Sequence, residues 1–275
     1  MKQMKIFKDK KKLKKEILGL KNLSFVPTMG GLHAGHKYLI QRAKQKKAKV
    51  LVSIYVNPKQ FNSKNDYIKY PKNINKDLKY LKKLKVNYVF IPSFNDIFLF
   101  KPKNKIYLDS FSSKLCGKFR RNHFKGVINV INRFLEILNP KYIFLGKKDL
   151  QQLYLIKKHI LFNKIKTVII PCNTIREKNG MACSSRNQNL SDKQKIIGSK
   201  IYSFLIKEKI TNKGKIINKY YLDKIKNKII QFGAKKIDYL EFLNANNPSV
   251  KKSSKKKSNF FIAYYLKNTR LIDNL

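Results

Sequence analysis

Near the start of the 275-residue chain, a short apolar run is followed by a glycine-rich turn. Residues 23–26 have the composition of a short buried strand, and residues 27–31 (PTMGG) then break it with types that suit tight turns. From His36 onward, apolar residues recur at helical spacing. A strand, a turn and a helix in this order aim the free N–H groups and the positive end of the helix dipole at the carboxyl edge of the strand. Such an arrangement is typical of a phosphate-binding site.

Two histidines, His33 and His36, stand where this turn enters the helix, with Gly35 between them. Two imidazoles beside a phosphate site can donate hydrogen bonds to charge that develops on phosphorus. The alternatives are ordinary turn histidines or half of a metal site. A zinc site is disfavoured because the pattern His-Glu-x-x-His is not present and no third ligand lies near.

Strand-like and helical patterns alternate through the first two thirds of the chain. Further strands are predicted at residues 50–56, 86–91, 142–145 and 168–170, and helices at 8–18, 77–84, 127–138 and 151–161, with 94–118 irregular. This alternation favours an α/β fold with a Rossmann-like parallel sheet, in which ligands bind at the carboxyl ends of the strands. Residues 27–36, 57–61 and 146–152 each follow a strand directly, so we expect these three segments to converge on one cleft.

The pattern changes from about residue 175. A loop with Arg176 and residues 180–187 (GMACSSRN) precedes helices expected near 192–208 and 216–232 and strands expected at 237–243 and 260–266. Residues 246–258 form a polar connection rich in Lys and Ser. We therefore expect two domains: residues 1–174 form the Rossmann-like domain, and residues 175–275 form a smaller α+β domain.

The formal net charge of +48 would ordinarily point to nucleic acid or an anionic membrane. Most of the basic residues are lysine, however, and they are spread over the whole chain. Lysine, isoleucine and asparagine share A/T-rich codons, so genomic base bias is an alternative explanation of the excess. A solvated lysine surface is therefore favoured over a specific nucleic-acid site.

Three widely spaced cysteines show no zinc-like pairing, which favours a reducing compartment. No apolar run of the length that spans a membrane is present, and charged residues interrupt the N-terminal region where a signal peptide would be apolar. The expectation is a cytoplasmic protein without a membrane partner.

Six segments in order carry a family resemblance: PTMGGLHAGH at 27–36, VSIYVNPKQF at 52–61, YPK at 70–72, HFKGV at 123–127, GKKDLQQL at 146–153 and SSRN at 184–187. Together with the closing residues 269–274, they resemble the pantoate-β-alanine ligases (pantothenate synthetases). This family is similar to class I aminoacyl-tRNA synthetases and other HIGH-type nucleotidyltransferases.

The resemblance implies an ATP-binding Rossmann-like domain with a C-terminal lid, a homodimer, and Mg²⁺ with ATP as the nucleotide. It also implies a reaction in two steps. The carboxylate of pantoate attacks the α-phosphorus of ATP and gives pantoyl adenylate and pyrophosphate; the amine of β-alanine then displaces AMP and gives pantothenate.

The resemblance also assigns roles to residues of this sequence. His36 is implied as the proton donor, with His33 and Lys148 as its catalytic partners. Gln60 is implied to hold pantoate and β-alanine, and Gln152 to hold pantoate. The residues implied to bind ATP are Met29, Gly30, Gly31, Leu32, His33, Ala34, Gly35 and His36, then Gly146, Lys147, Lys148 and Asp149, then Ile175, Cys183, Ser184, Ser185 and Arg186.

Asp77 is a candidate magnesium ligand, although a single aspartate on a helix is usually only solvated. The chain departs from the family pattern at Cys183, where Met is usual, at Asn179, where Asp is usual, and at Arg121-Asn122, where Pro-Gly is common. None of these positions is an expected catalytic group.

Two other functions compete with the ligase. One is a related nucleotidyltransferase that transfers AMP to a phosphate, which the glutamine pair disfavours. The other is a basic nucleic-acid-binding protein with a vestigial enzyme site; it depends on charge alone, since no RNA-binding motif is present.

Overall fold

The computed structural model describes residues 3–62, 64–212, 217–244 and 258–275. Its larger part is a six-stranded sheet with the strand order β1-β4-β3-β2-β5-β6, in which all neighbours are parallel. The strands are β1 Lys5–Phe7, β2 Leu23–Thr28, β3 Lys49–Ile54, β4 Tyr88–Phe90, β5 Tyr142–Gly146 and β6 Val168–Cys172. This confirms the predicted Rossmann-like α/β fold.

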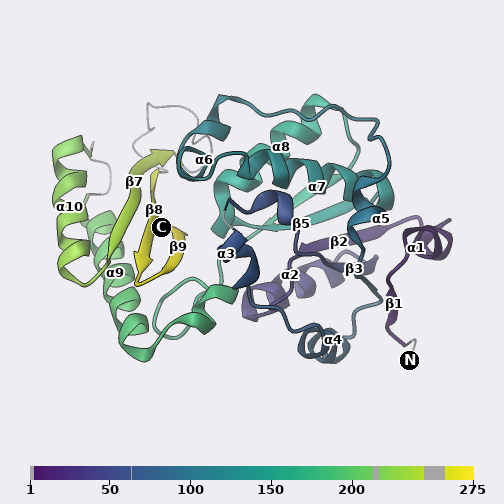
Figure 1. Ribbon diagram of the computed structural model, residues 1–275, viewed down its shortest axis with the longest axis horizontal. Coiled ribbons are helices and arrows are strands. Elements are labelled where there is room, and N and C mark those ends of the chain that lie inside the picture. The colour runs from purple at the N-terminus through teal and green to yellow at the C-terminus, as the bar shows by residue number, and fades with distance from the viewer. Residues whose placement is uncertain (1–2, 63, 213–216, 245–257) are drawn as a thin grey trace.

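Helices cover both faces of this sheet (Figure 1). On one face pack α1 Lys10–Ile17, α7 His123–Leu138 and α8 Leu150–Phe162. On the other face pack α2 Ala34–Lys44 and α4 Ile74–Lys83. The shorter helices are η1 Pro58–Gln60, α3 Lys64–Ile68, α5 Phe94–Phe98, η2 Ser110–Ser113, α6 Cys116–Phe119, η3 Lys147–Asp149 and η4 Ser185–Asn189.

Strand β3 shows why the central strands read as continuous apolar runs. Leu51 belongs to the hydrophobic core beside α7, whereas Val50 and Val52 belong to the core beside α2 and α4. Successive side chains of a strand point to opposite faces, and here helices cover both of them. By the same alternation, Ser53 and the following Tyr55 face α7.

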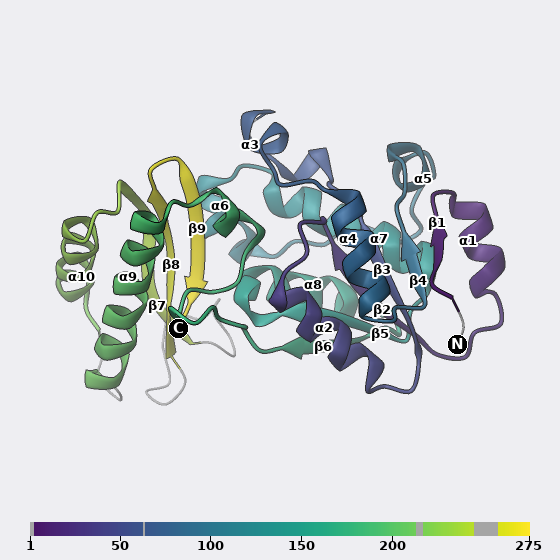
Figure 2. The same cartoon turned by 90° about the horizontal axis from the view of Figure 1, so that it is seen from below.

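The C-terminal part has a sheet of its own, separate from the first (Figures 1 and 2). Strands β7 Lys236–Asn244, β8 Ser258–Leu266 and β9 Thr269–Asn274 are antiparallel. Helices α9 Asp192–Thr211 and α10 Lys219–Gln231 pack against this sheet around a second hydrophobic core that includes Ile201, Ile229 and Phe260.

Some sequence-based expectations differ from the structure. Strand β2 continues through Pro27 and Thr28, which were expected to break it. Strands β1 and β9 were not predicted, and residues 94–118 contain three short helices instead of irregular chain only. The expected connection at 246–258 lies almost wholly outside the described residues. Among the described helices, none is long and apolar enough to cross a bilayer.

Candidate active site

Strand order places the three predicted segments together. Because β2 lies between β3 and β5, the chain leaves β2 toward one edge of the sheet and later returns beside it toward the other edge. Crevices that bind ligands form at such reversals, outside the carboxyl ends of the strands. The turns after β2, β3 and β5 all line a cavity of about 240 Å³ there. The expected convergence is therefore confirmed.

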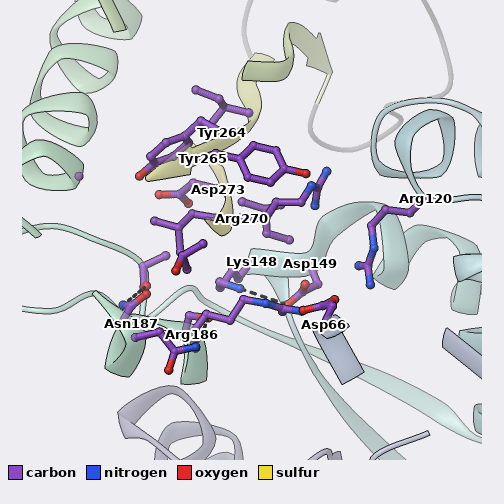
Figure 3. Close-up of a pocket in the computed structure, with 18 of the residues that line it drawn as sticks. Asp66, Arg120, Lys148, Asp149, Arg186, Asn187, Tyr264, Tyr265, Arg270 and Asp273 are labelled. Atoms are coloured by element: carbon purple, nitrogen blue, oxygen red, sulfur yellow. Dashed lines mark hydrogen bonds and ion pairs between the residues drawn. The ribbon is translucent and has the colours of Figure 1, made fainter. Parts of the chain in front are cut away.

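A larger cavity of about 750 Å³ lies next to the first, between the two sheets (Figure 3). Lys148, Asp149 and Arg186 line it from the N-terminal side, and Arg270 and Asp273 line it from β9. Figure 3 shows the side chains of both parts directed into the same space. A ligand that filled both cavities would touch both parts of the chain.

The structure brings most of the predicted site residues onto the smaller cavity: Met29, His33, Gly35, His36, Gln60, Gly146, Lys148, Asp149, Gln152, Ile175, Cys183, Ser184, Ser185 and Arg186. The other predicted residues are not part of this lining: Gly30, Gly31, Leu32, Ala34, Asp77 and Lys147. Leu32 and Asp77 line a separate surface hollow beside α4, and Lys147 donates a hydrogen bond to Asn173 at 2.9 Å.

His33 and His36 cap the first turn of α2. The backbone N–H of Gly35 donates to Nδ1 of His33 at 3.1 Å, and the backbone N–H of His33 donates to Nδ1 of His36 at 3.3 Å. Both Nδ1 atoms are therefore acceptors, so each neutral ring carries its proton on Nε2. The sequence folds this way because the two histidines take the positions at which Ser and Glu form the usual capping box.

Burial keeps both rings neutral. The pKa of His33 is lowered to about 4, first by burial and then by the charge of Lys148. The pKa of His36 is lowered well below its ordinary value by burial, by His33 and by Lys148. Neutral rings with Nε2–H groups can donate hydrogen bonds to an anion without first losing a bound proton.

The turn between β2 and α2 needs its glycines and Asp77. Gly30 and Gly31 have φ of +77° and +61°, which side chains disfavour. The two carboxylate oxygens of Asp77 accept from the N–H groups of Gly31 at 2.9 Å and of Leu32 at 2.8 Å. Asp77 is only 3% exposed. Its contacts show a backbone clamp, and its proposed contact with magnesium stays a prediction.

Lys148 and Asp149 lie in η3, directly after β5, with Lys148 Nζ 3.8 Å from Asp149 Oδ2. Strand β9 holds this turn: Nδ2 of Asn274 donates to the carbonyls of Lys147 at 2.8 Å and Lys148 at 2.7 Å. The position of Lys148, the expected cation, therefore depends on β5 in the N-terminal part and on β9 in the C-terminal part.

The loop at 183–187 reaches over the cavity and bonds to the N-terminal part. Arg186 donates to both oxygens of Asp66, at 2.9 and 3.0 Å, and Ser185 donates to the hydroxyl oxygen of Tyr70 at 3.1 Å. At its start, the N–H of Cys183 donates to the carbonyl of Ile175 at 2.9 Å. The position of Cys183 is therefore set by a hydrogen bond of its backbone.

Gln60 is held through its own backbone. Its carbonyl accepts from Nδ1 of His123 at 2.8 Å and from Arg120 at 3.3 Å, while its side-chain amide contacts the sulfur of Met29. Arg120 also donates to Nε2 of His123 at 3.0 Å. Burial, followed by the charge of Arg120, lowers the pKa of His123 to about 3, so this ring is also neutral.

Sequence reasoning gave no role to Asp66, Arg120 or His123. Arg120 lines the larger cavity across from Arg270 (Figure 3), and burial together with Arg186 lowers its pKa to about 10. The rarity of arginine in this lysine-rich chain was the signal. The planar guanidinium of arginine suits carboxylate and phosphate groups better than the ammonium of lysine does.

Comparison with known proteins agrees with this geometry. The profile of the family described as pantoate-beta-alanine ligase matches residues 4–275. The pantothenate synthetase of Endomicrobium trichonymphae is 39% identical over 99% of this chain and 97% of its own length. That of Francisella tularensis subsp. novicida is 37% identical over 95% of this chain and 92% of its own.

Solved structures give the same result. A crystal structure of the Francisella tularensis pantoate-beta-alanine ligase, complexed with Beta-gamma ATP and beta-alanine, matches with a TM-score of 0.85 and 37% identity, over 99% of this chain and 97% of that one. The Thermus thermophilus pantothenate synthetase matches with a TM-score of 0.88 and 26% identity, over 99% of both chains. With its parallel sheet, its histidine-capped turn and its full-length match, the chain belongs to the pantoate-β-alanine ligase family.

Proposed function

We propose that this protein condenses (R)-pantoate with β-alanine at the expense of ATP, giving pantothenate, AMP and pyrophosphate through a pantoyl adenylate. This is a step of pantothenate and coenzyme A biosynthesis. The observation that carries the proposal is the pair of neutral histidines at the N-terminus of α2, whose Nδ1 atoms are both occupied by backbone donors. The 37% identical Francisella tularensis ligase, complexed with Beta-gamma ATP and beta-alanine, supports the choice of substrates.

In the first step, the carboxylate of pantoate attacks the α-phosphorus of ATP and pyrophosphate leaves. Negative charge grows on the phosphoryl oxygens and on the leaving group. The Nε2–H groups of His33 and His36 and the N-terminus of α2 donate to that charge, and Lys148 adds a cation beside them. Arg186, on the loop above, supplies a guanidinium fork for the pyrophosphate.

In the second step, the amine of β-alanine attacks the acyl carbon, and AMP leaves with the electrons of the bond that it shared with that carbon. The carboxylate of β-alanine needs a cation at the far side of the cavity. Arg120 meets this need, because its hydrogen bonds within the described chain are to His123 and to the carbonyl of Gln60, neither of which carries negative charge. Gln60 lines both cavities, which supports its proposed contact with both substrates.

Magnesium would enter with ATP and neutralise part of the phosphate charge. Among the described residues no group of three or more His, Cys, Asp or Glu side chains could hold a metal. This fits Mg²⁺, which is usually held by substrate phosphates and water with one or two carboxylates. Asp77 is the candidate for such a carboxylate.

Residues 1–174 bind ATP and pantoate, residues 175–275 act as a lid, and the protein works as a cytoplasmic homodimer. The contacts of the loop at 183–187 and of Asn274 with the N-terminal part support the lid.

The test measures release of AMP and pyrophosphate from ATP with pantoate, with and without β-alanine. We expect AMP only when both substrates are present, in a one-to-one ratio with pantothenate. Folded protein that gives no turnover with both substrates would overturn the proposal. AMP transfer to a phosphorylated acceptor instead would favour the nucleotidyltransferase.

A further inference from the structure

Two buried hydroxyl groups on β3 and the residue after it lack a hydrogen-bond partner. They are Oγ of Ser53 and Oη of Tyr55, and neither bonds to any described residue. Buried polar groups in folded proteins are nearly always hydrogen-bonded, so each exception calls for an explanation. Both residues line the smaller cavity of the candidate active site.

The fold fixes the position of Tyr55 in the lining of that cavity. Its backbone N–H donates to the carbonyl of Thr28 at 3.1 Å, so the residue is tied to the neighbouring strand β2. Its ring meets the ring of Phe134 edge-on, with centroids 6.3 Å apart. Phe134 in turn packs against Phe25 and Phe90 in the hydrophobic core. Tyr55 therefore belongs to the floor of the cavity, where it cannot easily turn away.

The rest of the cavity combines an apolar wall with a few polar groups. Its lining includes Val127, Val130 and Ile131 of α7 and the glutamines Gln60 and Gln152. The neutral imidazoles of His33 and His36 line the same cavity at the N-terminus of α2. Such a space suits a small acid with a branched apolar carbon and hydroxyl groups, whose carboxylate faces ATP.

This inference rests on the proposed function. Pantoate has a carboxylate at one end, a primary hydroxyl at the other, and a carbon with two methyl groups between them. When its carboxylate meets ATP beside the histidines, its two methyl groups lie against α7 and its primary hydroxyl reaches the floor. We propose that Tyr55 determines specificity for the acid substrate by hydrogen bonding to this terminal hydroxyl, with Ser53 as the second hydroxyl at the same floor.

The ionisation of Tyr55 agrees with this role. Burial, with a smaller effect of Tyr67, raises its pKa to about 12. The phenol therefore stays protonated at neutral pH, and it can both donate to and accept from a substrate hydroxyl.

The experiment compares Tyr55→Phe with the unaltered enzyme on two acids: pantoate, and 2-hydroxy-3,3-dimethylbutanoate, which lacks only the terminal hydroxyl. The unaltered enzyme should prefer pantoate, and Tyr55→Phe should lose most of this preference. The KM for pantoate should rise about three- to tenfold, as expected for one neutral hydrogen bond, while the KM values for ATP and β-alanine stay within about twofold. Ser53→Ala should lower the preference in the same direction.

The matched control is Tyr142→Phe, which removes a tyrosine hydroxyl on the opposite face of the sheet. It should leave the preference unchanged. Thermal unfolding of Tyr55→Phe without substrate should occur at or above the temperature of the unaltered protein, because the lost hydroxyl has no partner there. An equal preference for pantoate in Tyr55→Phe and the unaltered enzyme would overturn the inference. Absence of turnover in the unaltered enzyme would instead overturn the proposed function.

Discussion

Arg186 donates two hydrogen bonds to the carboxylate of Asp66, and both residues line the larger cavity. The two residues come from different segments, the loop at 183–187 and the short helix α3. The same guanidinium is the one proposed to bind the pyrophosphate part of ATP. A triphosphate must therefore compete with Asp66 for Arg186.

Asp66→Asn should weaken this competition. We expect the KM for ATP to fall by up to about fivefold, because partly exposed ion pairs contribute about 0.2–1 kcal/mol. Steady-state kinetics at saturating pantoate and β-alanine measure it. Asp223→Asn, which breaks the Lys226 pair on α10, is the control and should leave the KM unchanged. A raised KM for ATP in Asp66→Asn would show that Asp66 assists ATP binding.

Asp77→Ala separates a backbone clamp from a metal ligand. The substitution leaves the N–H groups of Gly31 and Leu32 without their acceptor, and each loss costs about 1–3 kcal/mol when buried. The free energy of unfolding should fall even without magnesium and ATP, as urea denaturation would show. A loss of stability with no recovery of activity in excess Mg²⁺ would remove Asp77 from the proposed magnesium site. Recovery of activity at high Mg²⁺ with unchanged stability would identify Asp77 as a metal ligand.

His36→Ala should lower kcat by about 10²–10³, the usual effect of removing one preorganised donor to a developing anion. His36→Gln, which keeps an N–H donor, should lose less. The control Lys37→Ala changes the exposed neighbour on the same helix and should keep nearly full activity. Rapid-quench measurement of pantoyl adenylate formation locates the effect in the first step. Equal losses for Ala and Gln would contradict a donor role.

Arg120→Gln should act mainly on the second step. Without the guanidinium, β-alanine loses the cation for its carboxylate, so its KM should rise at least tenfold. Pantoate-dependent exchange of pyrophosphate into ATP reports the first step alone and should change little. A comparable loss in the exchange reaction would show that Arg120 instead acts through Gln60, whose carbonyl it contacts.

Acid should destabilise the fold through histidines that are buried in the neutral form. The pKa of His159 is lowered to about 4 by burial, and its Nδ1 accepts from the N–H of Tyr107 at 3.3 Å. Between its unfolded pKa near 6.5 and its folded pKa near 4, the unfolded chain binds more protons, so stability falls as pH falls through this window. Urea denaturation at several pH values should show a shallower fall for His159→Gln than for the unaltered protein.

The sequence predicted the elements whose signals are local. The turn after β2 was found because glycines and histidines follow an apolar run, and β3 and β5 were found because helices bury both of their faces. Strand β1 was not predicted, because its three residues lie in a lysine-rich segment and their extended conformation depends on pairing with β4. Pro27 was expected to end β2, but the strand pairs with β3 through Thr28.

Residue spacing revealed the part of the site that one segment carries, whereas the roles of Gln60, Gln152 and the loop at 183–187 came from the family resemblance. His33 and His36 lie within a single turn, so their spacing revealed them. The contacts of Asp66 with Arg186 and of His123 with Gln60 join residues far apart in the chain, and no pattern of spacing indicates such pairs. The unpartnered hydroxyl of Tyr55 is visible only once its surroundings are known.

At Gly126, helix α7 packs closely against the turn that carries Gln60, so the substrate site forms only when this helix is in place. A Cβ there would stand 2.2 Å from the carbonyl oxygen of Lys59, and Nδ2 of Asn57 donates to the carbonyl of Gly126 at 3.1 Å. The conformation of the turn that carries Gln60 therefore depends on contact with α7, a helix that lies far from this turn in the sequence. Closing such a long loop costs entropy that only later contacts repay. A folding intermediate without docked α7 would therefore have no substrate pocket, and recovery of pantoate binding during refolding would report the docking of this helix.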